Sequence, residues 1–142
     1  SGQISSAAEA PEPTIDLLVV DDDPTFIRFL EFNLKRHAFR VLGCSTATDA
    51  RLIAPKCAAI LCDVHLGPNQ CGIELVSTLR CDGILTPIIM VSGDPTRATV
   101  EACIEAGIDD YLVKPFTVNK LLEKLRIHGI DARERTAAPA GA

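Results

Sequence analysis

The chain has 142 residues, with 14 Lys or Arg and 19 Asp or Glu, which gives a formal net charge of −5. A chain of this length can bury the core of one domain but not of two. Its negative charge and its lack of a basic stripe argue against direct nucleic acid binding. Although hydrophobic residues make up 47% of the sequence, no apolar run approaches the roughly 20 residues of a membrane span. We therefore expect a single domain that does not enter a membrane.

The sequence also indicates where the folded part begins and ends. Residues 1–13 are small, acidic and Pro-containing, and we expect a disordered leader with some residues left by cloning. Folding is expected over residues 14–129, whereas the Ala/Pro-rich tail over 130–142 has too little apolar surface to fold. The six cysteines form no CxxC pair and follow no secretory signal, which favours reduced thiols and a cytoplasmic location.

Strand and helix signals alternate along the rest of the chain. Short apolar runs bounded by polar residues predict buried strands, and apolar residues three or four apart predict helices. Pro24 suits the first turn of a helix with Asp23 as its cap, and Gly107 can end another helix in a left-handed conformation. In chain order we expect a strand over 15–20, a helix from 24, a strand over 39–44, a helix over 46–54, a strand ending at 63, a helix over 72–80, a strand over 87–91, a helix over 95–106, a strand over 111–113 and a helix that includes 118–125.

Polar residues stand at the ends of four of these strands. An Asp triplet, residues 21–23, follows the first strand, Asp63 ends the third, Ser92 follows the fourth and Lys114 follows the fifth. Short buried strands of this kind predict a parallel sheet, and their carboxyl ends meet at one edge. We therefore expect these polar groups to form a site at that edge.

The charges of this site favour a divalent cation. Two like charges about 4 Å apart repel by roughly 4 kcal/mol at an effective dielectric constant near 20, so Asp21, Asp22 and Asp63 cannot all be bare anions in one crevice. Lys114 supplies one positive charge, and a divalent cation would neutralise the rest. Hard oxygen ligands favour Mg²⁺ over zinc.

The site residues carry a family resemblance. The series Asp21–Asp22, Asp63, Ser92 and Lys114–Pro115 resembles, in order and in spacing, the receiver domain of two-component response regulators of the chemotaxis-regulator type. The resemblance covers residues 14–129. It implies an α/β, doubly wound, flavodoxin-like fold, in which a five-stranded parallel sheet of order 2-1-3-4-5 carries five helices on its two faces.

The resemblance implies a phosphoryl acceptor and a metal site. Asp63 would take a phosphoryl group from a phosphohistidine on a histidine kinase or a histidine phosphotransfer protein, in a Mg²⁺-dependent reaction. Asp22, Asp63 and the backbone carbonyl of His65 would bind Mg²⁺ directly, Asp21 would hold it through water, and Mn²⁺ can substitute. Such a domain is a signalling module and not an enzyme, since it catalyses only its own phosphorylation and slow self-dephosphorylation.

Further roles follow from the same resemblance. Lys114 would pair with Asp63 and later with the phosphoryl oxygens, while Ser92 would donate a hydrogen bond to the phosphoryl group. The bond from Lys114 to Pro115 matches the family's cis peptide bond, which aims the lysine. Tyr111 matches the family's switch aromatic, which moves together with the Ser92 hydroxyl; the alternative is a half-buried aromatic at the sheet edge.

Two residues at the mouth of the pocket can set the lifetime of the phosphate. His65 and Asp94 stand two residues after Asp63 and Ser92, at positions that flank the phosphoryl group in the family. One hypothesis is that they pair across the path of an attacking water. The alternative is that both point to solvent.

The resemblance also implies partner surfaces. The signal would leave through the face formed by the fourth helix, the fifth strand and the fifth helix, and this allows a phosphorylation-dependent homodimer.

A kinase's helical hairpin could dock beside the acidic pocket on the first helix, although the aromatics there could equally be exposed incidentally. On that helix Phe26, Ile27, Leu30 and Leu34 share the core face, Phe29 and Phe32 lie off it, and the candidate docking residues are Phe26, Phe29 and Phe32. The receiver could stand alone or belong to a longer protein.

The sequence departs from the family pattern after Asp63. Pro68 and Gly72 stand five and nine residues after the Asp, where the family usually has them at four and eight. One inserted residue is the simplest account, and it leaves open how the loop reaches the metal. Ser92 replaces the commoner Thr and keeps the hydroxyl.

An enzyme remains as an alternative on one stretch of the chain. Asp21, Asp23 and Thr25 satisfy DxDxT and resemble the first motif of the haloacid-dehalogenase phosphatases, with Asp21 as nucleophile and Asp23 as acid/base. That family needs a further acidic metal pair on a strand after its lysine, which this chain lacks, and Asp63 would have no role. The two hypotheses differ in which Asp becomes phosphorylated.

Overall fold

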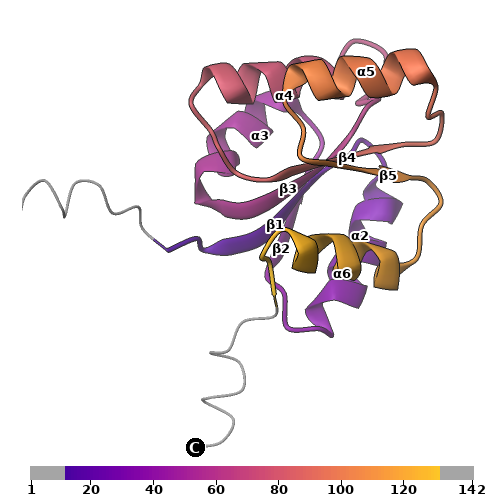
Figure 1. Cartoon of the computed structure of the whole chain (residues 1–142). Coiled ribbons are helices and arrows are strands. Elements are labelled where there is room, and N and C mark those ends of the chain that lie inside the picture. The colour runs from indigo at the N-terminus through magenta and orange to yellow at the C-terminus, as the bar shows by residue number, and fades with distance from the viewer. Residues whose placement is uncertain (1–11, 132–142) are drawn as a thin grey trace, which may run out of the picture.

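The structure of the protein is a computed structural model that describes residues 12–131 (Figure 1). Most of the expected leader and tail, over 1–11 and 132–142, lies outside the described residues. In chain order the elements are β1 (Ile15–Val20), α2 (Pro24–Lys35), β2 (Val41–Cys44), α3 (Ala47–Ile53), the 3-10 turn η1 (Ala54–Lys56), β3 (Cys57–Asp63), α4 (Gly72–Cys81), β4 (Ile88–Ser92), α5 (Arg97–Ala106), β5 (Asp110–Val113) and α6 (Val118–Ile127).

The strands form one parallel sheet in the order β2-β1-β3-β4-β5, as the family resemblance implies. Val20 at the end of β1 pairs with Cys44 at the end of β2 and with Cys62 in β3. Ser92 at the end of β4 pairs with Val113 at the end of β5. The strand ends are therefore level, and the polar residues around them meet at one edge of the sheet.

Helices cover both faces of this sheet (Figure 1). Because side chains alternate along a strand, each central strand contributes to two cores. In β1, Leu18 and Val20 pack in the core beneath α3, α4 and α5, whereas Leu17 and Val19 pack with α2 and α6. The predicted two-faced α/β architecture, with five helices over residues 12–131, is confirmed. Within this range no helix is long and apolar enough to cross a bilayer.

Local signals in the sequence set the ends of several helices. The Asp23 carboxylate accepts a hydrogen bond from the Thr25 backbone N–H at 3.0 Å and caps α2, with Pro24 in the first turn. Gly107 ends α5 with φ 111°, a left-handed conformation that glycine adopts without strain. These three predictions are confirmed.

Two element boundaries differ from the prediction by two residues, and the other predicted boundaries agree within one residue. β2 begins at Val41 and not at residue 39, because Ala38 has φ 67° in the turn after α2 and Phe39 is buried against the core. α5 begins at Arg97 and not at residue 95, because Thr96 is its N-cap. Neither shift moves a polar residue away from the sheet edge.

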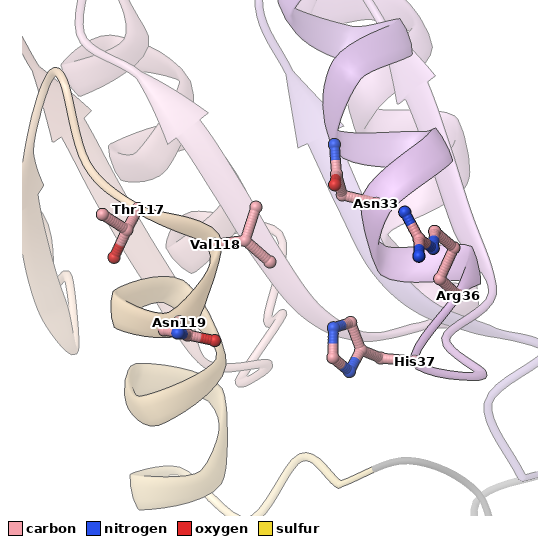
Figure 2. Close-up of a pocket in the computed structure, with 6 residues that line it drawn as sticks. All are labelled: Asn33, Arg36, His37, Thr117, Val118 and Asn119. Atoms are coloured by element: carbon pink, nitrogen blue, oxygen red, sulfur yellow. The ribbon is translucent and has the colours of Figure 1, made fainter.

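The outer sides of α2 and α6 leave a hollow of about 390 Å³ between them (Figure 2). Its walls come from the end of α2, with the turn that follows it, and from the start of α6. The lining residues are Asn33, Arg36, His37, Thr117, Val118 and Asn119.

Candidate functional site

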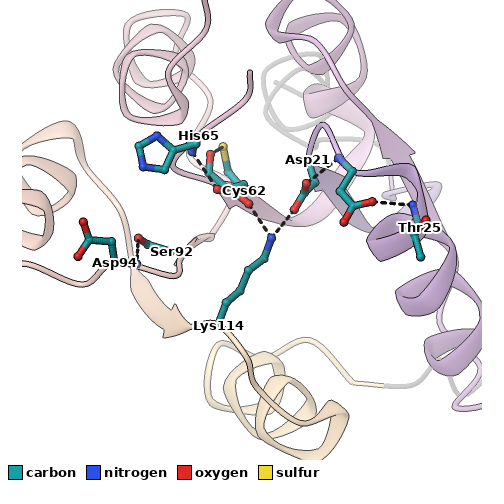
Figure 3. Close-up of polar contacts among 9 residues, drawn as sticks. Asp21, Thr25, Cys62, His65, Ser92, Asp94 and Lys114 are labelled. Carbon is teal, nitrogen blue, oxygen red and sulfur yellow. Dashed lines mark hydrogen bonds and ion pairs between the residues drawn. The ribbon is translucent and has the colours of Figure 1, made fainter. Parts of the chain in front are cut away.

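The predicted site residues meet at the carboxyl edge of the sheet (Figure 3). Asp21 directly follows β1, Asp63 ends β3, Ser92 ends β4 and Lys114 directly follows β5. The Lys114 ammonium lies 2.9 Å from Asp21 Oδ2 and 2.7 Å from Asp63 Oδ2, so one lysine bridges two carboxylates that are far apart in the sequence. The peptide bond from Lys114 to Pro115 is cis, as predicted.

Backbone N–H groups hold the second oxygen of each carboxylate. Asp21 Oδ1 accepts a hydrogen bond from the Asp23 N–H at 2.9 Å, and Asp63 Oδ1 accepts one from the His65 N–H at 2.8 Å. Asp63 is therefore fixed on one side by the loop after β3 and on the other by Lys114. Its carboxylate is largely buried, with 11% of the side chain exposed.

The electrostatics of the site agree with the predicted excess of negative charge. Burial raises the pKa of Asp21, and the hydrogen bonds from the Asp23 N–H and from Lys114 offset this only in part. For Lys114, burial lowers the pKa, but the hydrogen bonds to Asp63 and Asp21 outweigh it and the net pKa is raised. One ammonium thus balances two close carboxylates incompletely, which favours a further cation.

The donor atoms at this edge fit a hard cation that keeps part of its water shell. Within residues 12–131, no three His, Cys, Asp or Glu side chains are close enough to hold a metal ion by themselves. Mg²⁺ needs no such cage, because proteins commonly bind it through one or two carboxylates and several waters. The carboxylates of Asp21 and Asp63 lie at this edge, and Asp22 is exposed beside them.

Ser92, His65 and Asp94 line the outer part of the site. Ser92 is buried, and its Oγ accepts a hydrogen bond from the Asp94 backbone N–H at 3.0 Å, which leaves the hydroxyl proton available. His65 and Asp94 are both exposed, and among the described residues no ion pair joins them. The structure therefore gives no support to the predicted pairing across the pocket mouth.

Tyr111 is half-buried in β5, as the sequence predicts. It packs against the core on the side of α3, α4 and α5, and it pairs with Met90 of the neighbouring strand β4. Its hydroxyl is buried and has no hydrogen-bond partner among the described residues. A buried unsatisfied hydroxyl costs roughly 1–3 kcal/mol, so a position of the ring that gave it a partner would remove this cost.

The longer loop after Asp63 folds back over the site. Gly72 donates its N–H to the Val64 carbonyl at 2.7 Å, and a Cβ at this position would collide with the Asp63 backbone carbonyl. Gly67 has φ 104°, and a Cβ there would lie 3.7 Å from Asp22 Oδ2. Gly67 in this loop therefore lies beside the Asp22 carboxylate.

One contact in the site was not predicted. The Phe26 ring lies beneath the Lys114 ammonium, with 4.1 Å between the nitrogen and the ring centroid. The sequence placed Phe26 on the core face of its helix and among the docking residues, and it is half-buried against the core. The sequence did not show this contact, because Phe26 stands inside a helix and not at a strand end, and only the packing of that helix brings its ring to Lys114.

Comparisons with known proteins agree with this geometry. The sequence model of one protein family, the response regulator receiver domain, matches residues 17–126 of this chain. The chain is 34% identical over 124 residues to the transcriptional regulatory protein KdpE of Mycobacterium tuberculosis, covering 86% of this chain and 53% of that protein. It is also 34% identical over 116 residues to chemotaxis protein CheY1 of Helicobacter pylori, covering 78% of this chain and 94% of that one. The chain thus spans about half the length of the transcriptional regulators that it matches.

Solved structures show the same fold. A response regulator receiver protein from Pseudomonas putida has a TM-score of 0.72 at 29% identity and covers 84% of this chain and 99% of its own. The BeF3-activated receiver domain of Klebsiella pneumoniae RstA has a TM-score of 0.73 at 25% identity, covering 80% and 97%. With the sheet order, the bridged carboxylates and the family match together, the chain belongs to the response regulator receiver domains, which are signalling modules of two-component systems and not enzymes.

Proposed function

We propose that Asp63 accepts a phosphoryl group from a phosphohistidine on a histidine kinase or a phosphotransfer protein. The observation that carries this proposal is the fixation of its carboxylate, by the His65 N–H on Oδ1 and by Lys114 on Oδ2, at the end of a buried strand. BeF3-activated relatives support a phospho-aspartate role for this family. The phosphatase alternative is dropped, because the family match makes the chain a receiver and Asp23, its required acid/base, caps α2.

The transfer itself needs positioning and charge neutralisation. A carboxylate oxygen of Asp63 attacks the phosphorus, the P–N bond breaks, and the partner's histidine leaves with the electron pair. Lys114 moves from the carboxylates to the phosphoryl oxygens, and the Ser92 hydroxyl donates a hydrogen bond to them. Mg²⁺, for which Mn²⁺ can substitute, would be held by Asp21 (through water), Asp22, Asp63 and the carbonyl of His65, and would neutralise the phosphoryl charge.

The switch face would consist of α5, β5 and α6. Ser92 and Lys114 lie at the ends of β4 and β5, so drawing them towards a phosphoryl group acts on β5 directly. Tyr111 in β5, with its unpartnered hydroxyl, is the side chain that we expect to move. The same face exposes Ile104 and Val113 and has a hollow of about 420 Å³ beside Tyr111, Lys120 and Lys124. A phosphorylation-dependent homodimer would use these features.

The kinase or phosphotransfer partner would dock on α2. Phe29 and Phe32 are 49% and 65% exposed, and because they stand three residues apart on α2 their side chains are neighbours on the helix surface. Arg36 lies over the Phe32 ring at 5.8 Å and also lines the hollow between α2 and α6 (Figure 2). Phe26 is half-buried and would contribute only its outer edge.

His65 and Asp94 would tune the lifetime of the phosphate. Both are exposed beside the pocket, and because no ion pair joins them we expect each to act separately. Replacing either with Ala should change the rate of phosphate loss, and the two effects should multiply in the double variant.

Mass spectrometry of the intact protein tests the acceptor. Incubation with Mg²⁺ and acetyl phosphate should add about 80 Da, the mass of one phosphoryl group. Asp63→Asn should remove the adduct, whereas Asp49→Asn, a change at an exposed Asp of α3, should keep it. A chelator should abolish labelling, and decay of the adduct reports the roles of His65 and Asp94. An undiminished adduct in Asp63→Asn would overturn the assignment.

A further inference from the structure

Three groups surround the Lys114 ammonium in the described structure. The carboxylates of Asp21 and Asp63 accept hydrogen bonds at 2.9 and 2.7 Å, and the Phe26 ring lies beneath the nitrogen at 4.1 Å from its centroid. An ammonium has three N–H donors, and the two carboxylates use two of them. The ring faces the remaining side, where it attracts the cation through its negative face.

A second aromatic ring fixes the orientation of Phe26. The Phe116 ring meets it edge to face, with centroids 5.9 Å apart and an angle of 89° between the planes. This is a favourable arrangement for two aromatic rings. Lys114 and Phe116 stand on either side of Pro115, so the segment after β5 contacts Phe26 twice. The first turn of α2 and the segment that carries the lysine are therefore joined through one ring.

Phe26 thus contacts both the Lys114 ammonium and the Phe116 ring, although its position on the core face of α2 predicts only a contact with the core. Its neighbours on the core face, Leu30 and Leu34, are fully buried, whereas Phe26 is only half-buried and reaches the site. Lys114 keeps 26% of its side chain exposed, so the two carboxylates alone do not enclose it. A flexible four-carbon stem needs such support to hold its ammonium in one place.

We propose that Phe26 is a positioning residue for Lys114. Its ring holds the ammonium between Asp21 and Asp63 before phosphorylation, so that the lysine is already in place when a phosphoryl group arrives. The consequence for phosphorylation rests on the proposed function of Asp63, whereas the contact itself does not. An aliphatic side chain of similar size would fill the space without attracting the cation.

NMR of the unphosphorylated protein tests the contact. A lysine lying over an aromatic face is shielded by the ring current, so the Lys114 ε-methylene protons should resonate upfield of those of exposed lysines. Phe26→Leu should abolish this shift, and Phe26→Tyr should keep it. Phe39→Leu removes another ring from the same core without touching Lys114, and it should leave the shift unchanged.

Phosphorylation by acetyl phosphate, with saturating Mg²⁺, tests the consequence. We expect Phe26→Leu to slow the reaction about three- to tenfold, Phe26→Tyr to restore it, and Phe39→Leu to leave it unchanged. Phe26→Met provides a second aliphatic variant if Phe26→Leu does not fold. A retained upfield shift in the aliphatic variants, or an equal slowing in Phe26→Tyr, would overturn the proposal. If Asp63 is not the acceptor, the ring-current shift still appears, so the two failures can be told apart.

Discussion

At the scale of single residues, the site depends on one close approach between backbones. Gly72 begins α4 directly against the last residue of β3, with its Cα next to the Asp63 carbonyl. The hydrogen bond from the Gly72 N–H to the Val64 carbonyl holds this approach together. The loop between them supplies the N–H that fixes Asp63 Oδ1. A side chain at position 72 would therefore disturb Asp63, the proposed acceptor.

Gly72→Ala should both destabilise the protein and slow its phosphorylation. The new methyl would collide with a backbone oxygen that cannot move aside cheaply, so we expect a loss on the order of 2 kcal/mol or more in the free energy of unfolding. Gly93→Ala is the matched control, because a Cβ there meets nothing within 4 Å. Urea denaturation and acetyl phosphate labelling measure both effects. Equal stability of the two variants would contradict the predicted clash.

At the scale of elements, a half-buried carboxylate joins α6 to β5. Asp110, the first residue of β5, lies 2.7 Å from Lys124 Nζ and 2.9 Å from His128 Nε2, both near the end of α6. Burial raises the pKa of Asp110, but the hydrogen bonds from Lys124, His128 and the Tyr111 N–H outweigh it, and the net pKa is lowered. This contact ties two elements of the proposed switch face together.

Asp110→Asn should loosen α6 and change how stability depends on pH. Because the folded-state pKa of Asp110 is lowered, its charge stabilises the fold above the unfolded value of about 3.9 and is lost as pH falls through the lower folded value. At neutral pH we expect the variant to lose on the order of 1 kcal/mol, with the difference shrinking below about pH 4. Thermal unfolding between pH 2 and 7 measures this, and a pH-independent difference would speak against the ion pair.

At the scale of the whole molecule, the sheet separates the proposed acceptor from the proposed switch face. Asp63 ends β3 in the middle of the sheet, whereas β5 is an edge strand with α5 and α6 beside it. Ser92 and Lys114 connect the two regions, because each belongs to the site and lies at the end of β4 or directly after β5. A phosphoryl group adds negative charge at one end of this connection.

Adding beryllofluoride with Mg²⁺ should shift NMR signals mainly over residues 92–118. The physical reason is that Ser92 and Lys114 move towards the new charge and carry β5 and Tyr111 with them. Amide spectra recorded with and without beryllofluoride measure the response, and Asp63→Asn should show none. Shifts confined to the neighbourhood of Asp63 would mean that no switch reaches α5, β5 and α6.

The sequence by itself determined the order of the elements and the membership of the site. Buried strands and amphipathic helices are local patterns in the sequence. The apolar runs therefore predicted the parallel sheet, and caps such as Asp23 predicted where a helix begins. Polar residues at strand ends share an edge in any parallel sheet, which is why Asp21, Asp63, Ser92 and Lys114 could be grouped from their places in the sequence alone. The largest errors, at residues 39 and 95, fell at element ends, where a turn or a cap decides.

Only the tertiary structure decided how those residues meet. The bridge from Lys114 to both carboxylates, the Phe26 ring beneath it and the lack of an ion pair between the described residues His65 and Asp94 depend on distances through space. Residues far apart in the chain come into contact through the packing of α2 and the segment after β5. The spacing of apolar residues along the sequence does not predict that packing. Spacing along the chain thus selects the residues of the site, whereas packing sets the contacts among them.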